Sequence, residues 1–319
     1  MKKVVVTVPG KVHLMGEHAV VYGKPALLAA INLRLSVTIE EQLKKFSTAE
    51  KIVIVSTEPT EHARFAADYL LDQFKIIDQV PIRITIDSQI PAGFHLGSSA
   101  AVAVGLSGAM MYFFKKLWNP MRINELAYEI EKKQHGNPSG GDNTTETVGG
   151  FVWFRKELEF LKSIWQLPFK PHESLNHFFL INTGRPKETT GEMVALVKES
   201  MQRNPEEMKK HLDLNEQQVK RVTVALKEGN ERELLDAMRV GERTLEGMGV
   251  VSDKVIPLIR KIEDIGGAAK ILGGGGKAEG VGFLLCYYNN PDQVEEICKS
   301  YGFTIQEVRL GEEGVRLEK

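Results

Sequence analysis

Residues 90–101, IPAGFHLGSSAA, place two glycines and two adjacent serines directly before an apolar run that favours a helix. Gly93 and Gly97 allow backbone conformations that other residues resist, and they let the chain approach a ligand closely. Ser98 and Ser99 fall where the helix is expected to begin, and the unpaired amides and helix dipole at that end favour an anion. The segment therefore predicts a phosphate site, while a tight turn with a helix cap is the simpler interpretation.

A second group of reactive side chains lies near the N-terminus, where Lys11, Glu17 and His18 occur in one short segment. Residues 4–8 are rich in β-branched side chains and predict a strand that the following proline and glycine end. Lys11 is then expected in a loop, close to the carboxylate and the imidazole. A binding role and an ordinary charged surface loop both fit this pattern.

A third segment, HGNPSGGDNTTETVGGF at residues 135–151, contains Asp142 and Asn143, and its glycines and proline predict a long loop. It follows a predicted helix over residues 121–135, in which Glu131 stands beside the apolar face near the end. Asp and Asn are ordinary turn residues, so a decorated loop is one interpretation. The length of this small, polar stretch favours a site instead.

Length and composition restrict the classes of protein and partner. A chain of 319 residues exceeds what one compact core usually holds, which predicts two domains. A net charge of -1 argues against a nucleic-acid surface and favours a small partner. Cys286 and Cys298 offer neither a disulfide framework nor a metal motif, and no stretch is typical of a signal peptide or a membrane helix. A cytoplasmic protein is the expectation.

The hydrophobic pattern predicts a mixture of strands and helices around these segments. The expected strands after the first lie at residues 33–40, 51–56, 82–86, 151–154, 177–182 and 269–272, with two more in the last forty or so residues. Helices are expected at residues 60–75, after the serine pair, and repeatedly up to about residue 266. A glycine run, Gly273 to Gly276, separates two of the late strands.

Taken together, these segments resemble the motifs of the GHMP small-molecule kinases in order and spacing across almost the whole chain. The quoted motifs are PGKVHLMGEHAVVYGKPAL, GFHLGSSAA, HGNPSGGDN and KILGGGGK. The resemblance implies an α+β fold with a ribosomal-S5-like ATP-binding domain at residues 1–170 and a ferredoxin-like domain at residues 171–319. The active site is then expected in the cleft between them.

The resemblance also implies roles for individual residues. Lys11 and Asp142 are expected to form the catalytic pair, and Ser99 and Glu131 to hold Mg²⁺. Glu17, His18 and Thr189 are expected to line the acceptor pocket, where the family binds the carboxylate and hydroxyl groups of mevalonate. ATP is the expected co-substrate, and homodimers are common among similar proteins. The loop expected to wrap the ATP phosphates consists of Gly93, Phe94, His95, Leu96, Gly97, Ser98 and Ser99.

The expected reaction is transfer of the γ-phosphoryl group of ATP to the primary C5 hydroxyl of mevalonate. Such a transfer requires neutralised phosphate charge and an aligned acceptor, which amides, a metal ion and a lysine can supply. A carboxylate such as that of Asp142 can accept the hydroxyl proton.

Several residues depart from the family pattern. His95 stands where the family usually has glycine, and Leu272, Lys277 and Glu279 alter the third glycine motif. Two alternatives therefore remain open: a kinase acting on phosphomevalonate, with Arg185 or Lys277 as extra cations, and a non-catalytic ATP-binding sensor.

Overall fold

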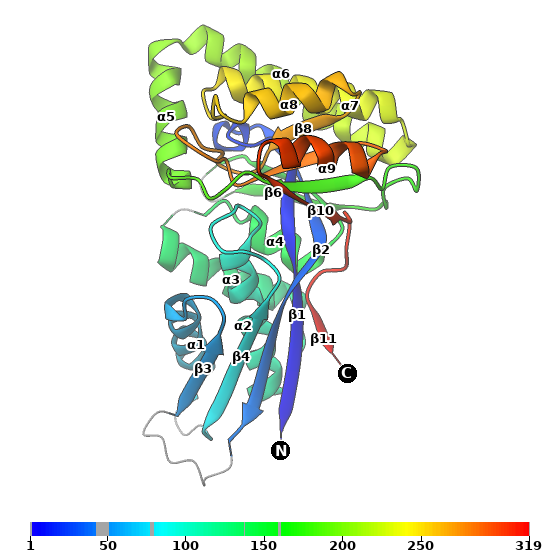
Figure 1. Cartoon of the computed structure of the whole chain (residues 1–319). Helices are drawn as coiled ribbons and strands as arrows, with labels where there is room; N and C mark the ends of the chain where they lie inside the picture. The colour runs from blue at the N-terminus through cyan, green and yellow to red at the C-terminus, as the bar shows by residue number, and fades with distance from the viewer. Residues whose placement is uncertain (1, 43–50, 77–79, 137, 159–160, 319) are drawn as a thin grey trace.

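The computed structural model describes residues 2–42, 51–76, 80–136, 138–158 and 161–318, so Asn137 of the HGNPSGGDN motif lies outside the described residues. The chain builds two β-sheets, each with helices packed against it. Figure 1 shows the long strands β1 and β2 rising from the part with α1–α4 into the part with α5–α9. These two strands therefore connect both parts of the molecule.

The larger sheet has the strand order β11-β1-β2-β4-β3, and β5 pairs with both β2 and β6. All of these pairs are antiparallel except β3 with β4. The strands are β1 (Lys3–Met15), β2 (Pro25–Glu41), β3 (Ile52–Ser56), β4 (Ile82–Ser88), β5 (Phe151–Lys156), β6 (Lys162–Leu167) and β11 (Arg316–Glu318).

Strand β1 corrects the prediction that a proline and glycine end the first strand. It continues to Met15, and the pairing with β2 shifts register between Pro9 and Gly10. A register shift accommodates a proline, which has no amide hydrogen to donate to the ladder. Lys11 therefore lies in a strand, opposite Ala30, rather than in a loop.

Helices α1 (Glu61–Phe74), α2 (Ser98–Lys115) and α3 (Pro120–His135) pack beside one another, and α2 lies against β1 and β2. The predicted start of a helix at the serine pair is confirmed. Helix α2 is apolar on nearly every side because it is enclosed by the sheet and its neighbouring helices. Gly105 lets it approach the sheet, since a Cβ atom there would lie 2.7 Å from Val37 Cγ2.

Helix α4 (Gly141–Val148) replaces the long loop predicted for this segment. Its sequence, GDNTTETV, has weak helix propensity and no clear apolar stripe. Packing against β1, β2, β5 and two neighbouring helices stabilises it instead. The loop prediction was therefore wrong for residues 141–148, and Asp142 stands in the first turn of a helix.

The smaller sheet is antiparallel with the order β10-β7-β9-β8. Its strands are β7 (Phe178–Asn182), β8 (Ala268–Ile271), β9 (Phe283–Tyr287) and β10 (Thr304–Val308). A short 3-10 helix, η1 (Ala19–Tyr22), lies between β1 and β2. The helices associated with the smaller sheet are α5 (Thr190–Arg203), α6 (Pro205–Glu228), α7 (Glu231–Gly247), α8 (Ile256–Asp264) and α9 (Pro291–Ser300). The predicted strands and helices of this region are confirmed.

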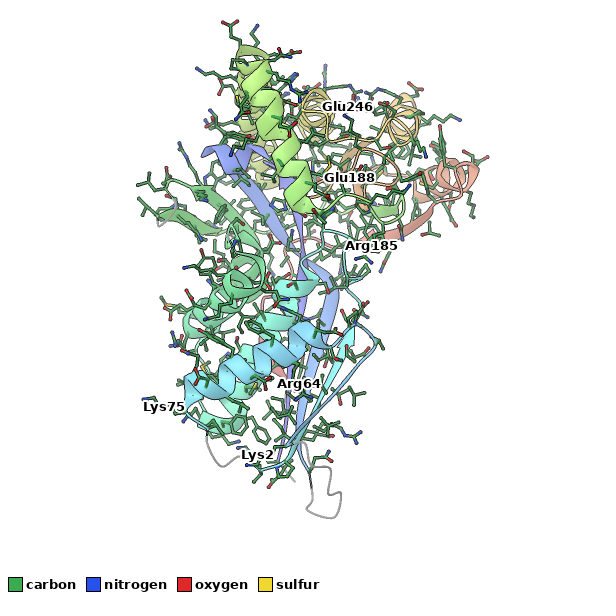
Figure 2. The ribbon with its side chains drawn as sticks, turned by 90° about the vertical axis from the view of Figure 1, so that its left-hand side faces the viewer. Lys2, Arg64, Lys75, Arg185, Glu188 and Glu246 are labelled. Carbon is green, nitrogen blue, oxygen red and sulfur yellow. The ribbon has the colours of Figure 1, made fainter. Side chains whose placement is uncertain are left out.

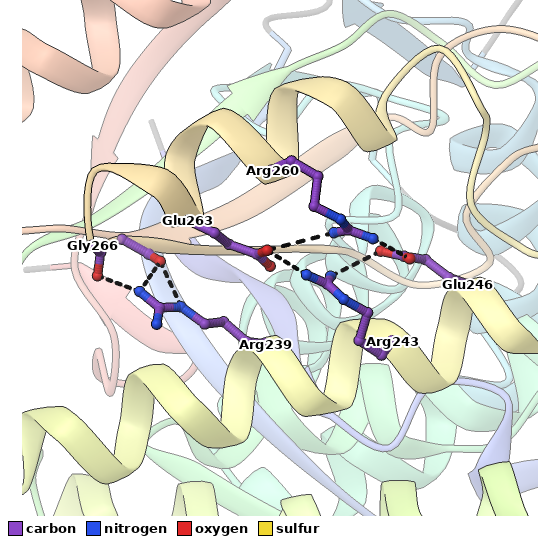
Figure 3. Close-up of polar contacts among 7 residues, drawn as sticks. Arg239, Arg243, Glu246, Arg260, Glu263 and Gly266 are labelled. Carbon is purple, nitrogen blue, oxygen red and sulfur yellow. Dashed lines mark hydrogen bonds and ion pairs between the residues drawn. The ribbon is translucent and has the colours of Figure 1, made fainter.

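An ion-pair network joins α7 to α8 (Figure 3). Arg243 contacts Glu246 and Glu263, and Arg260 contacts the same two carboxylates. Arg239 donates to the carbonyl oxygens of Gly266 and Gly267, just before β8. Because several charges share partners here, the network is expected to stabilise the packing of the two helices more than isolated surface ion pairs would. It fixes the two helices that support β8.

Cys286 and Cys298 are both buried free thiols, in agreement with the absence of a predicted disulfide framework. In the described part of the chain, no helix combines the length and the apolar character needed to cross a membrane. The division at residues 170/171 stays a prediction.

Candidate active site

The predicted phosphate loop leads directly into the N-terminus of α2. Gly97 is the N-cap residue with φ 86°, and the Lys11 amide donates to the Leu96 carbonyl oxygen at 3.0 Å. A side chain at Gly97 would collide with Glu146, because a Cβ atom would lie 1.9 Å from its Oε1. The loop is thus held against β1 while the first amides of α2 stay available for an anion.

Ser99 and Glu131, the predicted magnesium ligands, are direct neighbours. The Ser99 hydroxyl donates to Glu131 Oε1 at 2.7 Å, and the Glu131 side chain is largely buried. His62 of α1 lies beside both, with Nε2 3.1 Å from the Ser99 carbonyl oxygen and 3.4 Å from Glu131 Oε1. His62 was not predicted, because a single histidine in a helical pattern carries no signal of its own. A hydroxyl and a carboxylate are oxygen ligands that suit Mg²⁺.

Lys11 and Asp142, the predicted catalytic pair, are in contact. Lys11 Nζ lies 3.0 Å from Asp142 Oδ2, and the lysine side chain is 3% exposed against 38% for the aspartate. The ammonium also lies 3.4 Å from His13 Nδ1. Burial, followed by the charges of Lys11 and Lys270, lowers the pKa of His13 well below its usual value, so the neutral ring can accept from Lys11. The ammonium is buried and held, while the carboxylate is open to an acceptor.

Glu146, one helical turn after Asp142, is a second carboxyl group at this place. It is fully buried, and among the described residues its two oxygens make no hydrogen bond. Burial and then the nearby Asp142 raise its pKa well above the usual value, against the opposing effect of Lys11. The sequence did not predict that Glu146 is buried beside Asp142, because a glutamate in a loop-like segment is ordinarily exposed.

Glu17 forms a buried ion pair with Lys270 of β8, and both side chains are 0% exposed. Lys270 Nζ also donates to the carbonyl oxygens of His13 at 3.2 Å and Ile271 at 2.6 Å. Burial raises the pKa of Glu17, and the Lys270 ammonium opposes part of this rise. Within the described chain, Glu17 Oε2 has no hydrogen-bond partner, and the side chain is fully enclosed. The place of Glu17 in the acceptor pocket stays a prediction.

Glu242 of α7 contacts the backbone of β8. Its Oε2 accepts from the Ile271 amide at 3.0 Å, and burial raises its pKa to about 8, against the opposing charge of Lys270. At neutral pH the carboxyl group is therefore mainly protonated, and Lys270 pairs with Glu17.

The other two predicted acceptor residues differ in their surroundings. His18 is buried, and its Nε2 lies 3.1 Å from the Gly274 carbonyl oxygen in the glycine run. Burial lowers the pKa of His18, so its ring is neutral near neutral pH and Nε2 can donate to that carbonyl. Thr189 is exposed and is the N-cap of α5, where its hydroxyl accepts from the Glu192 amide at 3.2 Å. Its side chain is thus engaged in its own helix cap.

The arrangement brings together the parts that phosphoryl transfer to an alcohol requires. The start of α2 can bind phosphates, Ser99 and Glu131 can hold a metal ion, and Asp142 can accept a proton beside the Lys11 ammonium. The Glu17–Lys270 and His18–Gly274 contacts join this region to β8 and the glycine run. The candidate site therefore lies where the two parts of the molecule meet.

Comparisons with known proteins show which family this chain is similar to. The family model described as GHMP kinases N terminal domain matches residues 61–150. A mevalonate kinase of Archaeoglobus fulgidus is 31% identical over 276 residues, which cover 85% of this chain and 89% of that protein. The crystal structure of L. major mevalonate kinase in complex with R-mevalonate matches with a TM-score of 0.80 and 20% identity, over 98% of this chain and 97% of that chain. Streptococcus pneumoniae phosphomevalonate kinase, in complex with phosphomevalonate and AMPPNP, matches with a TM-score of 0.76 and 18% identity. The match covers 96% of this chain and 99% of that chain.

The likeness to the solved structures establishes the fold and confirms the predicted α+β class in its GHMP kinase form. The similarity to the Archaeoglobus enzyme extends over most of both chains, and the family model includes the phosphate loop, Glu131 and Asp142. Sequence, fold and site geometry lead to the same result: this chain belongs to the GHMP kinase family.

Proposed function

We propose that this protein is a mevalonate kinase, which transfers the γ-phosphoryl group of ATP to the primary hydroxyl of mevalonate. The observation that carries the proposal is the contact between buried Lys11 and accessible Asp142 beside the phosphate loop. The mevalonate kinase named among the relatives supports the choice of acceptor. A cytoplasmic location and a homodimer belong to the same proposal.

In the proposed reaction, Asp142 accepts the proton of the acceptor's primary hydroxyl. The hydroxyl oxygen then bonds to the γ-phosphorus as the bond from that phosphorus to the β,γ-bridging oxygen breaks, and ADP leaves. Lys11, fixed by Asp142 and His13, stabilises negative charge on the transferred group. The amides at the start of α2 orient the triphosphate.

Ser99 and Glu131 fit a magnesium ion, because both offer oxygen ligands and already lie within hydrogen-bond distance of each other. When bound, the ion would neutralise phosphate charge. His62 positions both ligands through its contacts with them.

The Ser99→Ala and Glu131→Gln variants are each expected to raise the Mg²⁺ concentration for half-maximal activity by about tenfold or more, since the first removes an oxygen ligand and the second removes the negative charge of a ligand. A magnesium titration at saturating ATP measures this change. Glu129→Gln is the control, because Glu129 lies on α3 like Glu131 but is not one of the predicted ligands. It removes an equal charge and should leave the Mg²⁺ requirement unchanged. Normal metal dependence in both site variants would refute the ligand roles.

Phosphomevalonate is the main alternative acceptor, because its extra phosphate needs extra cations. Arg185 lies between the upper and lower parts of the molecule in Figure 2, and its Nε would be 2.8 Å from a Cβ atom on Gly93. Lys277 is exposed, and its amide donates to Glu188 at 3.3 Å. Of these two candidates, Arg185 is the one next to the phosphate loop, and it is the residue on which this alternative depends.

An ATP-coupled assay with mevalonate, phosphomevalonate, homoserine and galactose tests the proposal. Mevalonate is expected to give the highest kcat/KM. Faster turnover with phosphomevalonate would favour the alternative, and a matched Arg185→Gln variant would then lose that activity selectively. Faster turnover with homoserine or galactose would refute the proposed acceptor.

A further inference from the structure

His95, in the middle of the phosphate loop, has a backbone conformation that side chains rarely adopt. Its φ is 65°, in the left-handed region that favours glycine. The loop also contains Gly93 and Gly97 with φ of 82° and 86°. A non-glycine residue keeps such a conformation only where its surroundings hold it in place. The contacts of the His95 ring are therefore informative.

The His95 side chain occupies a groove made by glycines of the C-terminal half. A Cβ atom on Gly273 would lie 2.6 Å from His95 Cβ, and one on Gly282 would lie 3.4 Å from His95 Cδ2. A Cβ atom on Gly274 would lie 3.4 Å from His95 Cε1. The imidazole fits because Gly273 in particular has no side chain. We call Gly273, Gly274 and Gly282 the glycine groove.

The residues before His95 contact the same half of the molecule. The Phe94 ring lies 5.4 Å from the Phe283 ring, centroid to centroid, and Gly93 lies beside the Arg185 guanidinium. On its other side the loop is fixed to the first half, since Leu96 accepts from the Lys11 amide and Gly97 begins α2. The loop thus bridges the two halves.

The His95 ring is uncharged at neutral pH. Burial, followed by the charge of Lys11, lowers its pKa to about 4, and the Gly275 carbonyl and Asp142 only partly oppose this. Its Nδ1 lies 3.5 Å from the Thr190 hydroxyl, and in the described structure Nε2 makes no hydrogen bond. Shape and packing, rather than an ion pair, therefore hold the ring in the glycine groove.

We propose that His95 is a positioning residue that latches the phosphate loop onto the glycine groove and thereby sets the affinity for ATP. The proposal rests on the proposed function only in that the loop binds ATP. Docking of His95 fixes the backbone of residues 93–97 before the nucleotide arrives, so less ordering entropy is lost on binding. His95, an altered residue of the second glycine motif, thus contacts Gly273 and Gly274 of the third motif.

A double-mutant cycle of His95→Gly and Gly273→Ala tests the latch without any enzymatic assay. In the wild-type background Gly273→Ala adds both backbone strain and a collision with His95, whereas in the His95→Gly background only the strain remains. We expect a coupling of about tenfold in the unfolding equilibrium constant, measured by chemical denaturation. Gly302→Ala, at φ 74° with nothing within 4 Å of the added Cβ, is the control for strain and should cost the same in both backgrounds. Additive effects of the two substitutions would overturn the latch.

The functional consequence is measured with a nonhydrolysable ATP analogue and by steady-state kinetics. His95→Gly is expected to weaken analogue binding and to raise KM for ATP by about tenfold, with kcat falling much less, because the chemical groups are untouched. Unchanged affinity for the analogue would overturn the proposal. A failure of the mevalonate assignment alone would leave both the coupling and the nucleotide binding intact, so the two proposals fail separately.

Discussion

Asp142→Asn is expected to reduce kcat by about 10²- to 10⁴-fold, because asparagine cannot accept the hydroxyl proton. The fold should persist, since the Asp142 side chain is partly exposed and the substitution keeps its size. Lys11 loses its carboxylate partner but keeps the contact with His13. ATP binding should remain, because the phosphate loop is unchanged. Single-turnover kinetics measure the rate of the chemical step, and binding of an ATP analogue measures the affinity for the nucleotide.

Asp292→Asn, an exposed aspartate in the first turn of α9, is the matched control and should keep full activity. A kcat within a few-fold of wild type in Asp142→Asn would contradict the role of a base. The same experiment distinguishes an enzyme from a non-catalytic ATP-binding sensor, because a sensor would have no turnover to lose.

Lys270→Met is expected to cost about 3–5 kcal/mol in the free energy of unfolding, because Glu17 would be left buried without an opposite charge. The side chain of Lys270 is fully buried and also satisfies two backbone carbonyl oxygens. Chemical denaturation measures the loss. Lys198→Met, at an exposed position on α5, is the control and should have little effect.

The double variant Lys270→Met/Glu17→Gln removes both charges and is expected to recover part of that stability. It should still be impaired in acceptor binding, because Glu17 is proposed to line the acceptor pocket. If Lys270→Met were no more destabilising than Lys198→Met, the buried ion pair would have no structural role.

The sequence predicted the residues that short motifs mark. Lys11 and Asp142 are in contact, as are Ser99 and Glu131, and the helix begins at the serine pair. Their catalytic and metal-binding roles stay predictions. These residues could be located from the sequence because glycine turns and helix starts depend mainly on neighbouring residues in the chain.

Residues that act through distant contacts could not be predicted in this way. Lys270 stands in an apolar strand pattern, and its partner Glu17 is 253 positions away. His62 and Glu146 likewise become part of the site only through packing. Helix α4 was missed because tertiary contacts outweigh its weak propensity. Thr189 was assigned to the acceptor pocket, and its role as the cap of α5 was missed although residues 189–192, TTGE, have the spacing of a capping box.

Strand β11 comes from the end of the described chain but pairs with β1 from its beginning. It closes the edge of the first sheet beside β1, and Thr7 donates to Glu318 at 2.6 Å across 311 positions of the chain. During synthesis, the first sheet therefore cannot be finished until almost all of the described residues have left the ribosome. A fragment ending at residue 170 would leave β1 as an open edge that can pair with other chains. Separate expression of the first half should accordingly yield aggregates unless residues 316–318 are supplied.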